Sequence, residues 1–159
     1  MAKAIHQCTE IWQLSDYFQC SYLREHCEYW LCERLTASNI GVVWKFAQEH
    51  KLKHLLNNTM QFFITNFLAC SRVDEFYDLP KDFVKEALDK GEIDVKKDAL
   101  FEIILDWCQH YESRNNTNSS TNVGRNQKFQ SPLLQELLPP STLFCTEIKS
   151  WLLSKGRLM

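Results

Sequence analysis

The chain has 159 residues, 45% of them hydrophobic and 24% charged, a composition typical of a globular domain and not of a disordered or collagen-like chain. Its 18 basic and 20 acidic side chains are interspersed and give a formal net charge of -2. A nucleic-acid-binding protein that works mainly through phosphate contacts is therefore not expected. With only 4 Gly and 4 Pro, the chain also has too few turn residues for a β-sandwich, so an all-α fold is predicted.

The cysteines and the apolar segments bear on the compartment. Seven cysteines are present, an odd number without the density of a disulfide framework, so reduced thiols are expected. The first residues contain no apolar stretch of signal-peptide length, and no window approaches the length of a membrane-spanning helix. We therefore expect a protein of the cytoplasm, or of the nucleus, with no membrane contact.

Two amphipathic helices are predicted at the start of the chain. Over residues 10–19, Ile11, Leu14 and Phe18 fall at helical spacing with polar residues between them. A second helix is predicted from about Ser21, a capping residue type, with Cys27 among the apolar residues of one side. The short joint between the two predicts an antiparallel helix pair.

Two further helices are predicted in the middle of the chain. Ser38 and Asn39 are capping residue types that precede an apolar pattern running through Ala47. A longer helix is predicted from Leu52 to about Cys70, because its apolar residues form one stripe.

Proline and glycine mark the next helix. Pro80 suits a first helical turn and Gly91 suits a helix end, and residues 92–95 are predicted to be a short extended connection. In the following helix, over residues 98–109, only Glu102 and Asp106 are polar between Ala99 and Cys108. These two carboxylates lie one turn apart and form a narrow polar stripe, which predicts the central buried helix of the domain.

A polar segment without periodicity follows. Residues 113–130 are rich in Asn, Ser and Thr and bury too little apolar surface to offset their ordering entropy, so a mobile loop is predicted. A leucine-rich segment from Leu133 to Leu138 then precedes Pro139 and Pro140.

Several segments carry a resemblance to a known family. They are Leu35–Ala47 (LTASNIGVVWKFA), Asn66-Phe67, Glu75–Leu79, Leu88, Val95, Phe101–Trp107, Tyr111 and Arg114. Together they resemble the BACK domain, the helical module that follows the BTB fold in BTB-kelch proteins. Ser15–Gln19 and Cys27–Leu31 look like the last helices of a BTB domain and the adjoining helix pair. The resemblance predicts stacked antiparallel helix pairs and a division into residues 1–34 and a BACK-like domain at 35–159.

The resemblance implies a substrate adaptor of cullin-RING ubiquitin ligases. In BTB-kelch proteins the BTB fold dimerises and, with the next helix pair, binds cullin three, the kelch propeller holds the substrate, and the BACK helices act as a spacer. Neither a BTB sheet nor a kelch repeat is predicted here, so we expect a fragment or a reduced relative. The cullin-contact candidates lie on the first two helices: Tyr17, Gln19, Tyr22, Glu25 and His26. A structural scaffold or a transcription-associated BTB-BACK relative without a ubiquitin role remains the alternative.

Two groups of residues have a spacing that bears on metal binding. His50 and His54 are four residues apart, but Lys occupies the position of the catalytic Glu of a metalloprotease motif. The sulfur and imidazole groups at Cys20, His26, Cys27 and Cys32 do not have zinc-knuckle spacing, and free thiols acting as small hydrophobes account for the cysteines. No metal site and no cofactor are therefore predicted.

Two pairs of side chains bear on catalysis. Glu102 and Asp106 form a solvent stripe more readily than an acid-base pair, and Cys108 and His110 are two apart, so they do not face each other on a helix. No glycine-rich phosphate loop is present. A non-enzymatic protein-interaction module is predicted.

Overall fold

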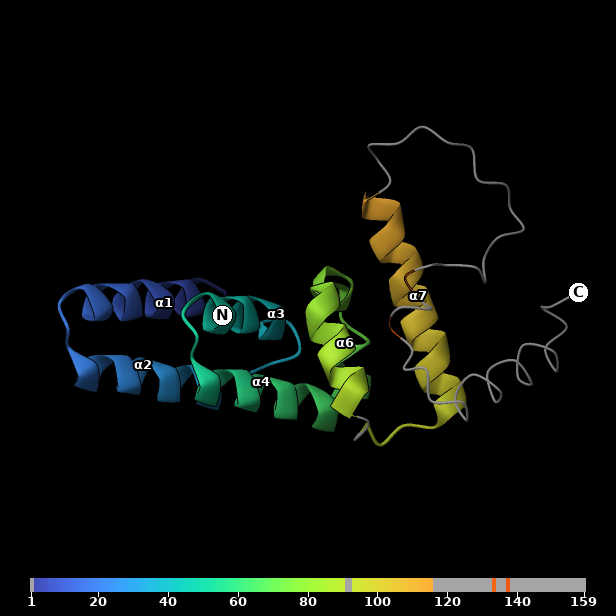
Figure 1. The fold of residues 1–159 in the computed structure, drawn as a ribbon, viewed down its shortest axis with the longest axis horizontal. Coiled ribbons are helices and arrows are strands. Elements are labelled where there is room, and N and C mark those ends of the chain that lie inside the picture. Colours follow the sequence, from blue (N-terminus) through green and yellow to red (C-terminus); the bar gives the residue numbers. More distant parts are fainter. Residues whose placement is uncertain (1, 91–92, 116–132, 134–136, 138–159) are drawn as a thin grey trace, which may run out of the picture. The chain divides into compact units, whose positions relative to one another are not determined.

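The computed structural model describes residues 2–90 and 93–115, together with Leu133 and Leu137. Every regular element in this part of the chain is a helix, which confirms the predicted all-α fold. The chain divides into two compact units, Met1–Leu79 and Pro80–Met159, and each is described by itself. The elements are α1 (Ala2–Tyr17), α2 (Ser21–Glu33), α3 (Ile40–Glu49), α4 (Lys53–Thr65), α5 (Phe67–Cys70), the 3-10 helix η1 (Asp74–Asp78), α6 (Lys81–Lys90) and α7 (Lys97–Asn115) (Figure 1).

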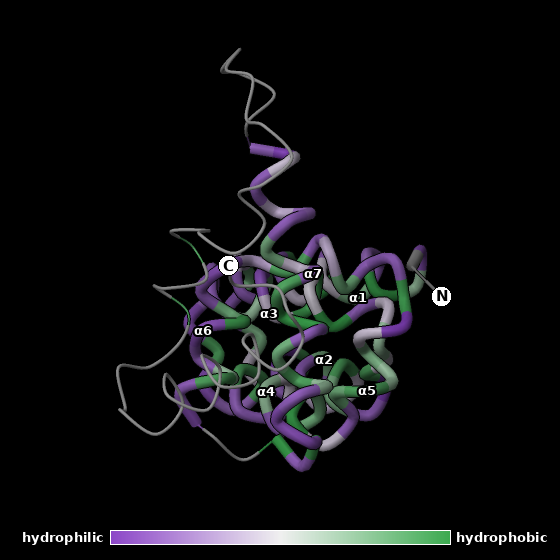
Figure 2. Tube along the Cα trace, turned by 90° about the vertical axis from the view of Figure 1, so that its right-hand side faces the viewer, coloured by the Kyte–Doolittle hydropathy of each residue, from purple (hydrophilic) through white to green (hydrophobic). Residues whose placement is uncertain are grey.

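The first unit is built from two helix pairs. Helices α1 and α2 run side by side in opposite directions, α3 packs on α4 in the same way, and α2 also contacts α4 (Figure 1). Along each helix, hydrophobic residues recur among hydrophilic ones, as expected for a helix with one buried face (Figure 2). The shared core consists of Ile5, Cys8, Trp12, Cys27, Leu31, Val43, Phe46, Ala47 and Leu55.

The apolar face predicted for α1 is wrong. The structure buries Ile5, Cys8 and Trp12, whereas Ile11 and Leu14 are exposed. Both sets have helical spacing, so α1 carries two apolar stripes and only one of them can face α2 and α3. The sequence does not show which stripe the neighbouring helices cover.

Two residues in the left-handed conformation end α1 and α3. Gln19 has a φ of 56°, its N–H donates to the Asp16 carbonyl (3.1 Å), and the Cys20 N–H donates to the Ser15 carbonyl (2.8 Å). This pair of bonds is a Schellman motif, in which glycine is the usual residue. Lys51, also at 56°, occupies the same place after α3.

The predicted helix caps are wrong in detail. Helix α2 does begin at Ser21, but Cys20 stands at the N-cap and no side chain caps the helix. Asn39 stands at the N-cap of α3, yet its amide turns back to the preceding connection. Its Oδ1 accepts from the Thr36 N–H (2.9 Å) and its Nδ2 donates to the Arg34 carbonyl (2.7 Å). Asn39 therefore fixes the α2–α3 connection instead of capping α3.

The single helix predicted from Leu52 to Cys70 is broken at Asn66. The Asn66 side chain donates to the Phe62 carbonyl (2.9 Å), and its own N–H donates to the same carbonyl. A short polar side chain that competes for backbone groups favours a helix end. The chain resumes as α5, and the rings of Phe63, Phe67 and Phe76 then pack together, with centroids 5.4 to 6.4 Å apart.

The second unit contains α6 and α7. The Pro80 carbonyl accepts from the Phe83 and Val84 N–H groups, so this proline stands just before the first turn of α6. Gly91, predicted to end this helix, lies outside the described residues, as does Glu92 of the predicted connection. From Ile93 to Lys96 the chain has no regular structure.

Helix α7 confirms the predicted polar stripe and is longer than predicted. Glu102 and Asp106 are exposed, whereas Trp107 and Cys108 are fully buried. The first three residues of the predicted loop, 113–115, belong to this helix. The rest of that loop lies outside the described residues. The boundary predicted between residues 34 and 35 remains a prediction.

Candidate protein-interaction surface

The five predicted contact residues lie around the turn between α1 and α2, and all are exposed. Tyr17 ends α1 and is 79% exposed, and Tyr22 in the first turn of α2 is 78% exposed. The Tyr22 ring stacks on His26, with ring centroids 6.4 Å apart. Gln19 forms the turn itself, and Glu25 lies on the same side of α2. We call these five residues the turn surface.

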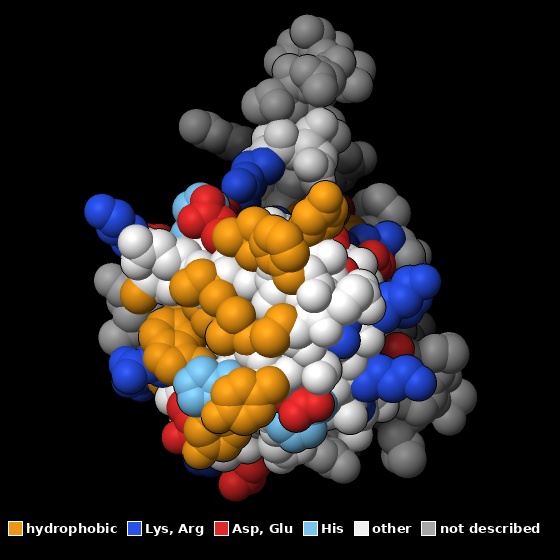
Figure 3. All heavy atoms as spheres, turned by 90° about the vertical axis from the view of Figure 1, so that its left-hand side faces the viewer, with side chains coloured by type: hydrophobic (Ala, Val, Ile, Leu, Met, Phe, Trp, Pro, Cys, Tyr) orange, Lys and Arg blue, Asp and Glu red, His pale blue; other side chains and the backbone are white. Residues whose placement is uncertain are grey.

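Apolar side chains that the prediction did not include in a contact site lie next to the turn surface. Leu14 is 59% exposed, Phe18 is 72% exposed, and the Phe18 ring packs edge-on against Tyr17 at 5.1 Å. Figure 3 looks onto this end of the first unit and shows hydrophobic side chains gathered on it beside histidines. The sequence indicates this exposed apolar surface through the second apolar stripe of α1. A helix with two such stripes can bury one in its own unit and leaves the other available to a partner.

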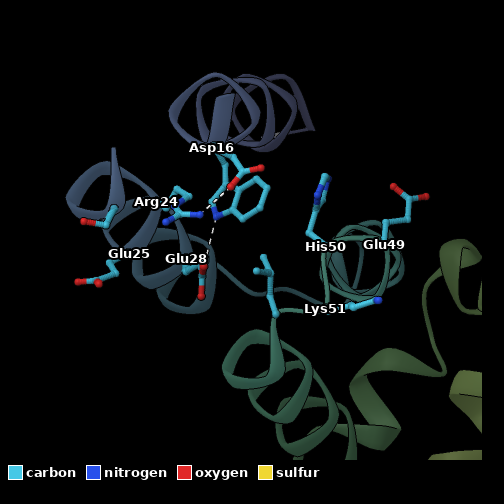
Figure 4. Close-up of a pocket in the computed structure, with 10 residues that line it drawn as sticks. Asp16, Arg24, Glu25, Glu28, Glu49, His50 and Lys51 are labelled. Atoms are coloured by element: carbon cyan, nitrogen blue, oxygen red, sulfur yellow. Dashed lines mark hydrogen bonds and ion pairs between the residues drawn. The ribbon is translucent and has the colours of Figure 1, made fainter. Parts of the chain in front are cut away.

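A polar pocket of about 500 Å³ lies beside the turn surface, between α1, α2 and the α3–α4 turn. The Arg24 guanidinium points to Asp16 and donates to its carboxylate at 2.6 Å, as Figure 4 shows. The indole N–H of Trp12 donates to Glu28 at 3.2 Å. The pocket is lined by Trp12, Asp16, Ser21, Arg24, Glu25, Glu28, Glu49, His50, Lys51 and Leu52.

The lining of this pocket carries a net negative charge. Four carboxylates line it against one Arg and one Lys, so its charge favours a basic group. His50 packs its ring against Trp12 at 4.5 Å and Phe46 at 4.7 Å, which places it in the wall of the pocket. His50 caps the end of α3 whereas His54 belongs to α4, so the two imidazoles do not share one helix face.

The thiols of the core are poor nucleophiles. Burial, with a smaller effect from Glu112, raises the pKa of Cys108 to about 12, and burial raises the pKa of Cys70 to about 11. Burial also raises the pKa of Cys8 to about 12, and its neighbour Cys27 contributes. All three remain protonated near neutral pH, so none is activated for attack.

Within residues 2–90 and 93–115, no group of three or more His, Cys, Asp or Glu side chains is placed to hold a metal ion. None of the described helices is both long enough and apolar enough to cross a bilayer.

Comparison with known proteins identifies the family. The family model BACK (BTB And C-terminal Kelch) matches residues 41–122, just over half of the chain. The chain belongs to the BACK family. The match begins within α3 and extends through α7, and it includes most of the segments on which the resemblance was predicted.

Relatives of this BACK chain are Kelch-like proteins. Kelch-like protein 24a of Danio rerio is 32% identical over 101 residues, which cover 63% of this chain and 17% of the relative. Kelch-like protein 24 of Homo sapiens is 30% identical over 129 residues, 80% of this chain and 19% of the relative. Kelch repeat and BTB domain-containing protein 8 of Xenopus tropicalis is 27% identical over 94 residues, 58% of this chain and 16% of the relative. The chain thus spans less than a fifth of the curated relatives that it matches.

Proposed function

We propose that the chain is the BTB-to-BACK segment of a substrate adaptor for cullin-RING ubiquitin ligases, and that it acts as a non-enzymatic spacer between cullin binding and substrate recognition. Membership of the BACK family and the Kelch-like relatives support this function. The adaptor works in the cytoplasm or nucleus, needs no cofactor and binds neither nucleic acid nor membrane. Its parent dimerises through a BTB domain.

The observation that carries the proposal is the exposed aromatic and apolar surface at the α1–α2 turn. Tyr17, Tyr22 and His26 supply rings, and Leu14 and Phe18 extend the same surface along α1. Exposed aromatic side chains that are packed against one another form good anchors for a protein partner, because little side-chain entropy is lost on binding. We place cullin three on the turn surface, with Gln19 and Glu25 at its polar margin.

The test measures binding of the N-terminal region of cullin three by calorimetry. One titration uses the isolated chain, and a second uses the chain preceded by the BTB domain of the Xenopus tropicalis relative. A partner that needs both surfaces should bind the isolated chain weakly or undetectably and the extended protein clearly. Tight binding by the isolated chain would refute a shared surface, and no binding by the extended protein would favour the scaffold alternative.

A matched pair of variants locates the contact. In the extended protein, changing both Tyr17 and Tyr22 to Ala should weaken binding at least about tenfold, the usual scale for loss of aromatic anchors. Leu68→Ala is the control, because Leu68 is also an exposed hydrophobic residue but lies on α5. Equal effects of the two changes would contradict the assignment of the turn surface.

A further inference from the structure

Two buried thiols face each other across the interface between α1 and α2. Cys8 lies on α1 and Cys27 on α2, and the two helices run side by side in opposite directions (Figure 1). Cys8 Sγ lies 3.7 Å from the carbonyl oxygen of Cys27, and a hydrogen bond also joins the two thiols. The side chains are 8% and 5% exposed and belong to the core of the first unit. Helix packing therefore brings together two cysteines that are 19 positions apart.

This arrangement is close to that of a disulfide, which requires an S–S bond of about 2.05 Å. Thiols that already share a hydrogen bond need only a short approach of their sulfur atoms to reach that length. The neighbouring cysteines have different surroundings. Cys20 is exposed, and the Cys32 sulfur accepts a hydrogen bond from Asn58. Cys8 and Cys27 are therefore the pair that helix packing selects for a bond.

The hydrogen bond gives the two thiols different roles. Burial raises the pKa of Cys8 to about 12, and Cys27 contributes through its charge and the hydrogen bond. Burial also raises the pKa of Cys27, whereas the hydrogen bond from Cys8 lowers it and the charge of Glu28 raises it. The hydrogen bond thus favours a thiolate at Cys27 and a protonated thiol at Cys8. Because burial opposes both thiolates, the pair reacts slowly near neutral pH.

We propose that Cys8 and Cys27 form an intramolecular disulfide when the chain meets hydrogen peroxide, an oxidant small enough for a closely packed helix pair. The Cys27 thiolate attacks one peroxide oxygen and breaks the O–O bond, which leaves a sulfenic acid on Cys27 and releases hydroxide. The Cys8 sulfur then attacks the Cys27 sulfur, the S–O bond breaks, and a second hydroxide leaves. The two hydroxides take up the two thiol protons, so two thiols and one peroxide give one disulfide and two molecules of water. The site goes beyond the adaptor function and does not depend on it.

The bond ties together the two helices that carry the turn surface. A disulfide between residues this far apart restricts the unfolded chain and usually raises the folding equilibrium constant by about thirtyfold or more. Oxidation should therefore raise the urea concentration at which the first unit unfolds. Burial also shields the finished bond from thiol reductants, because thiol–disulfide exchange requires access to a sulfur atom.

The first experiment maps the bond in the full chain. The protein is treated with hydrogen peroxide, the remaining thiols are alkylated, and a tryptic digest is analysed by mass spectrometry without reductant. The expected product is a pair of peptides joined through Cys8 and Cys27, two hydrogen atoms lighter than the separate peptides. Its rate of formation should rise about tenfold per pH unit above neutral pH, because the thiolate is the reactant.

The matched control is Cys20→Ser combined with Cys32→Ser. Trypsin cuts after Arg24, so this control leaves a single cysteine in each of the two linked peptides. The control should form the link, whereas Cys8→Ser and Cys27→Ser should each prevent it. A link through Cys20 or Cys32 instead, or oxidation of Cys27 to a sulfinic acid without any link, would overturn the proposal.

A second measurement uses the unchanged chain and so does not depend on whether a variant folds. Urea unfolding of the oxidised and the reduced chain is compared by circular dichroism. The oxidised chain should unfold at a higher urea concentration, and reduction of the unfolded protein should abolish the difference. A bond that forms only in urea, or an oxidised chain that unfolds at the same or a lower urea concentration, would show that the folded helix pair does not accept the bond.

Discussion

Replacing Trp107 by Ala should be strongly destabilising. Trp107 is the largest fully buried side chain among the described residues, and its ring stacks on Tyr111 with centroids 4.9 Å apart. Truncation of a buried Trp to Ala usually costs about 3 to 5 kcal/mol, because transfer energy is lost and a cavity remains. Loss of the aromatic pair adds about 0.5 to 1.5 kcal/mol. We expect a total of about 4 kcal/mol or more.

Trp107→Phe separates packing from polarity at the same position. The indole Nε1 is buried and has no hydrogen-bond partner among the described residues. An unsatisfied buried donor costs about 1 to 3 kcal/mol, and phenylalanine removes that donor while it keeps a ring. Removal of the unsatisfied donor offsets much of the free energy that is lost with the smaller side chain. We therefore expect Trp107→Phe to cost less than about 1 kcal/mol.

Urea unfolding followed by circular dichroism measures both variants. Because the chain contains two compact units, the tryptophan fluorescence transition is recorded as well, to show whether the units unfold together. Tyr29→Ala serves as the control, since Tyr29 is an exposed aromatic residue and should change stability by no more than about 0.5 kcal/mol. A loss below about 1 kcal/mol for Trp107→Ala would refute the assignment of Trp107 to the core of its unit.

Three further predictions concern turns, a buried amide and buried thiols. Lys51→Gly and Gln19→Gly should each raise the free energy of unfolding by up to about 1 kcal/mol in urea titrations, because glycine adopts a φ of 56° without strain. A lower free energy of unfolding in both variants would contradict the Schellman assignment. Asn39→Ala should cost about 1 to 3 kcal/mol, since it leaves two backbone groups without their partner, and an unchanged thermal midpoint would show that water replaces the amide. Burial raises the pKa of Cys8 and Cys108 from 9.0 to about 12, so folding favours the protonated thiols. Their contribution to the free energy of unfolding is complete below about pH 9 and is lost as the pH rises toward 12. Cys108→Ala should therefore lose less stability than the unchanged chain between pH 9 and pH 11, and equal losses would argue against a buried thiol.

Helix α7 shows what periodicity alone predicts well. Its apolar residues occupy all but one narrow sector, so only one orientation hides them, and the exposure of Glu102 and Asp106 follows. Helix α1 shows the limit of the same rule. Its stripes at Ile5 and Ile11 are equally periodic, and packing against α2 and α3 decides between them. A periodic pattern predicts that a helix has a buried face but cannot choose between two such faces.

Polar side chains with several available partners are harder to predict. Asn39 has the residue type and the position of an N-cap, yet its amide satisfies the backbone of Arg34 and Thr36. Asn66 likewise lies inside a helical apolar pattern and breaks it by binding the Phe62 carbonyl. In both cases local hydrogen bonds of similar strength compete, so the tertiary arrangement determines the outcome.

The contact of Cys32 with His54 lies beyond any spacing rule. Residues 32 and 54 are 22 positions apart, and α2–α4 packing brings them within 4.0 Å. The spacing of His50 and His54 is regular, but the α3–α4 turn separates their helices. Linear spacing therefore predicts contacts within one helix, whereas the Cys32–His54 contact joins two.

The exposed stripe of α1 explains why a partner needs more than the turn surface. Covering a large apolar side chain completely contributes about 1.5 to 3 kcal/mol. Ile11, Leu14 and Phe18 are only about half to three quarters exposed, so together they offer roughly 3 to 5 kcal/mol. Association costs an estimated 4 to 15 kcal/mol in lost rotation and translation before any side chain is ordered. The stripe can therefore contribute to an interface but cannot hold a partner by itself, and this is the physical reason to expect tight cullin binding only when a BTB domain supplies the remaining contacts.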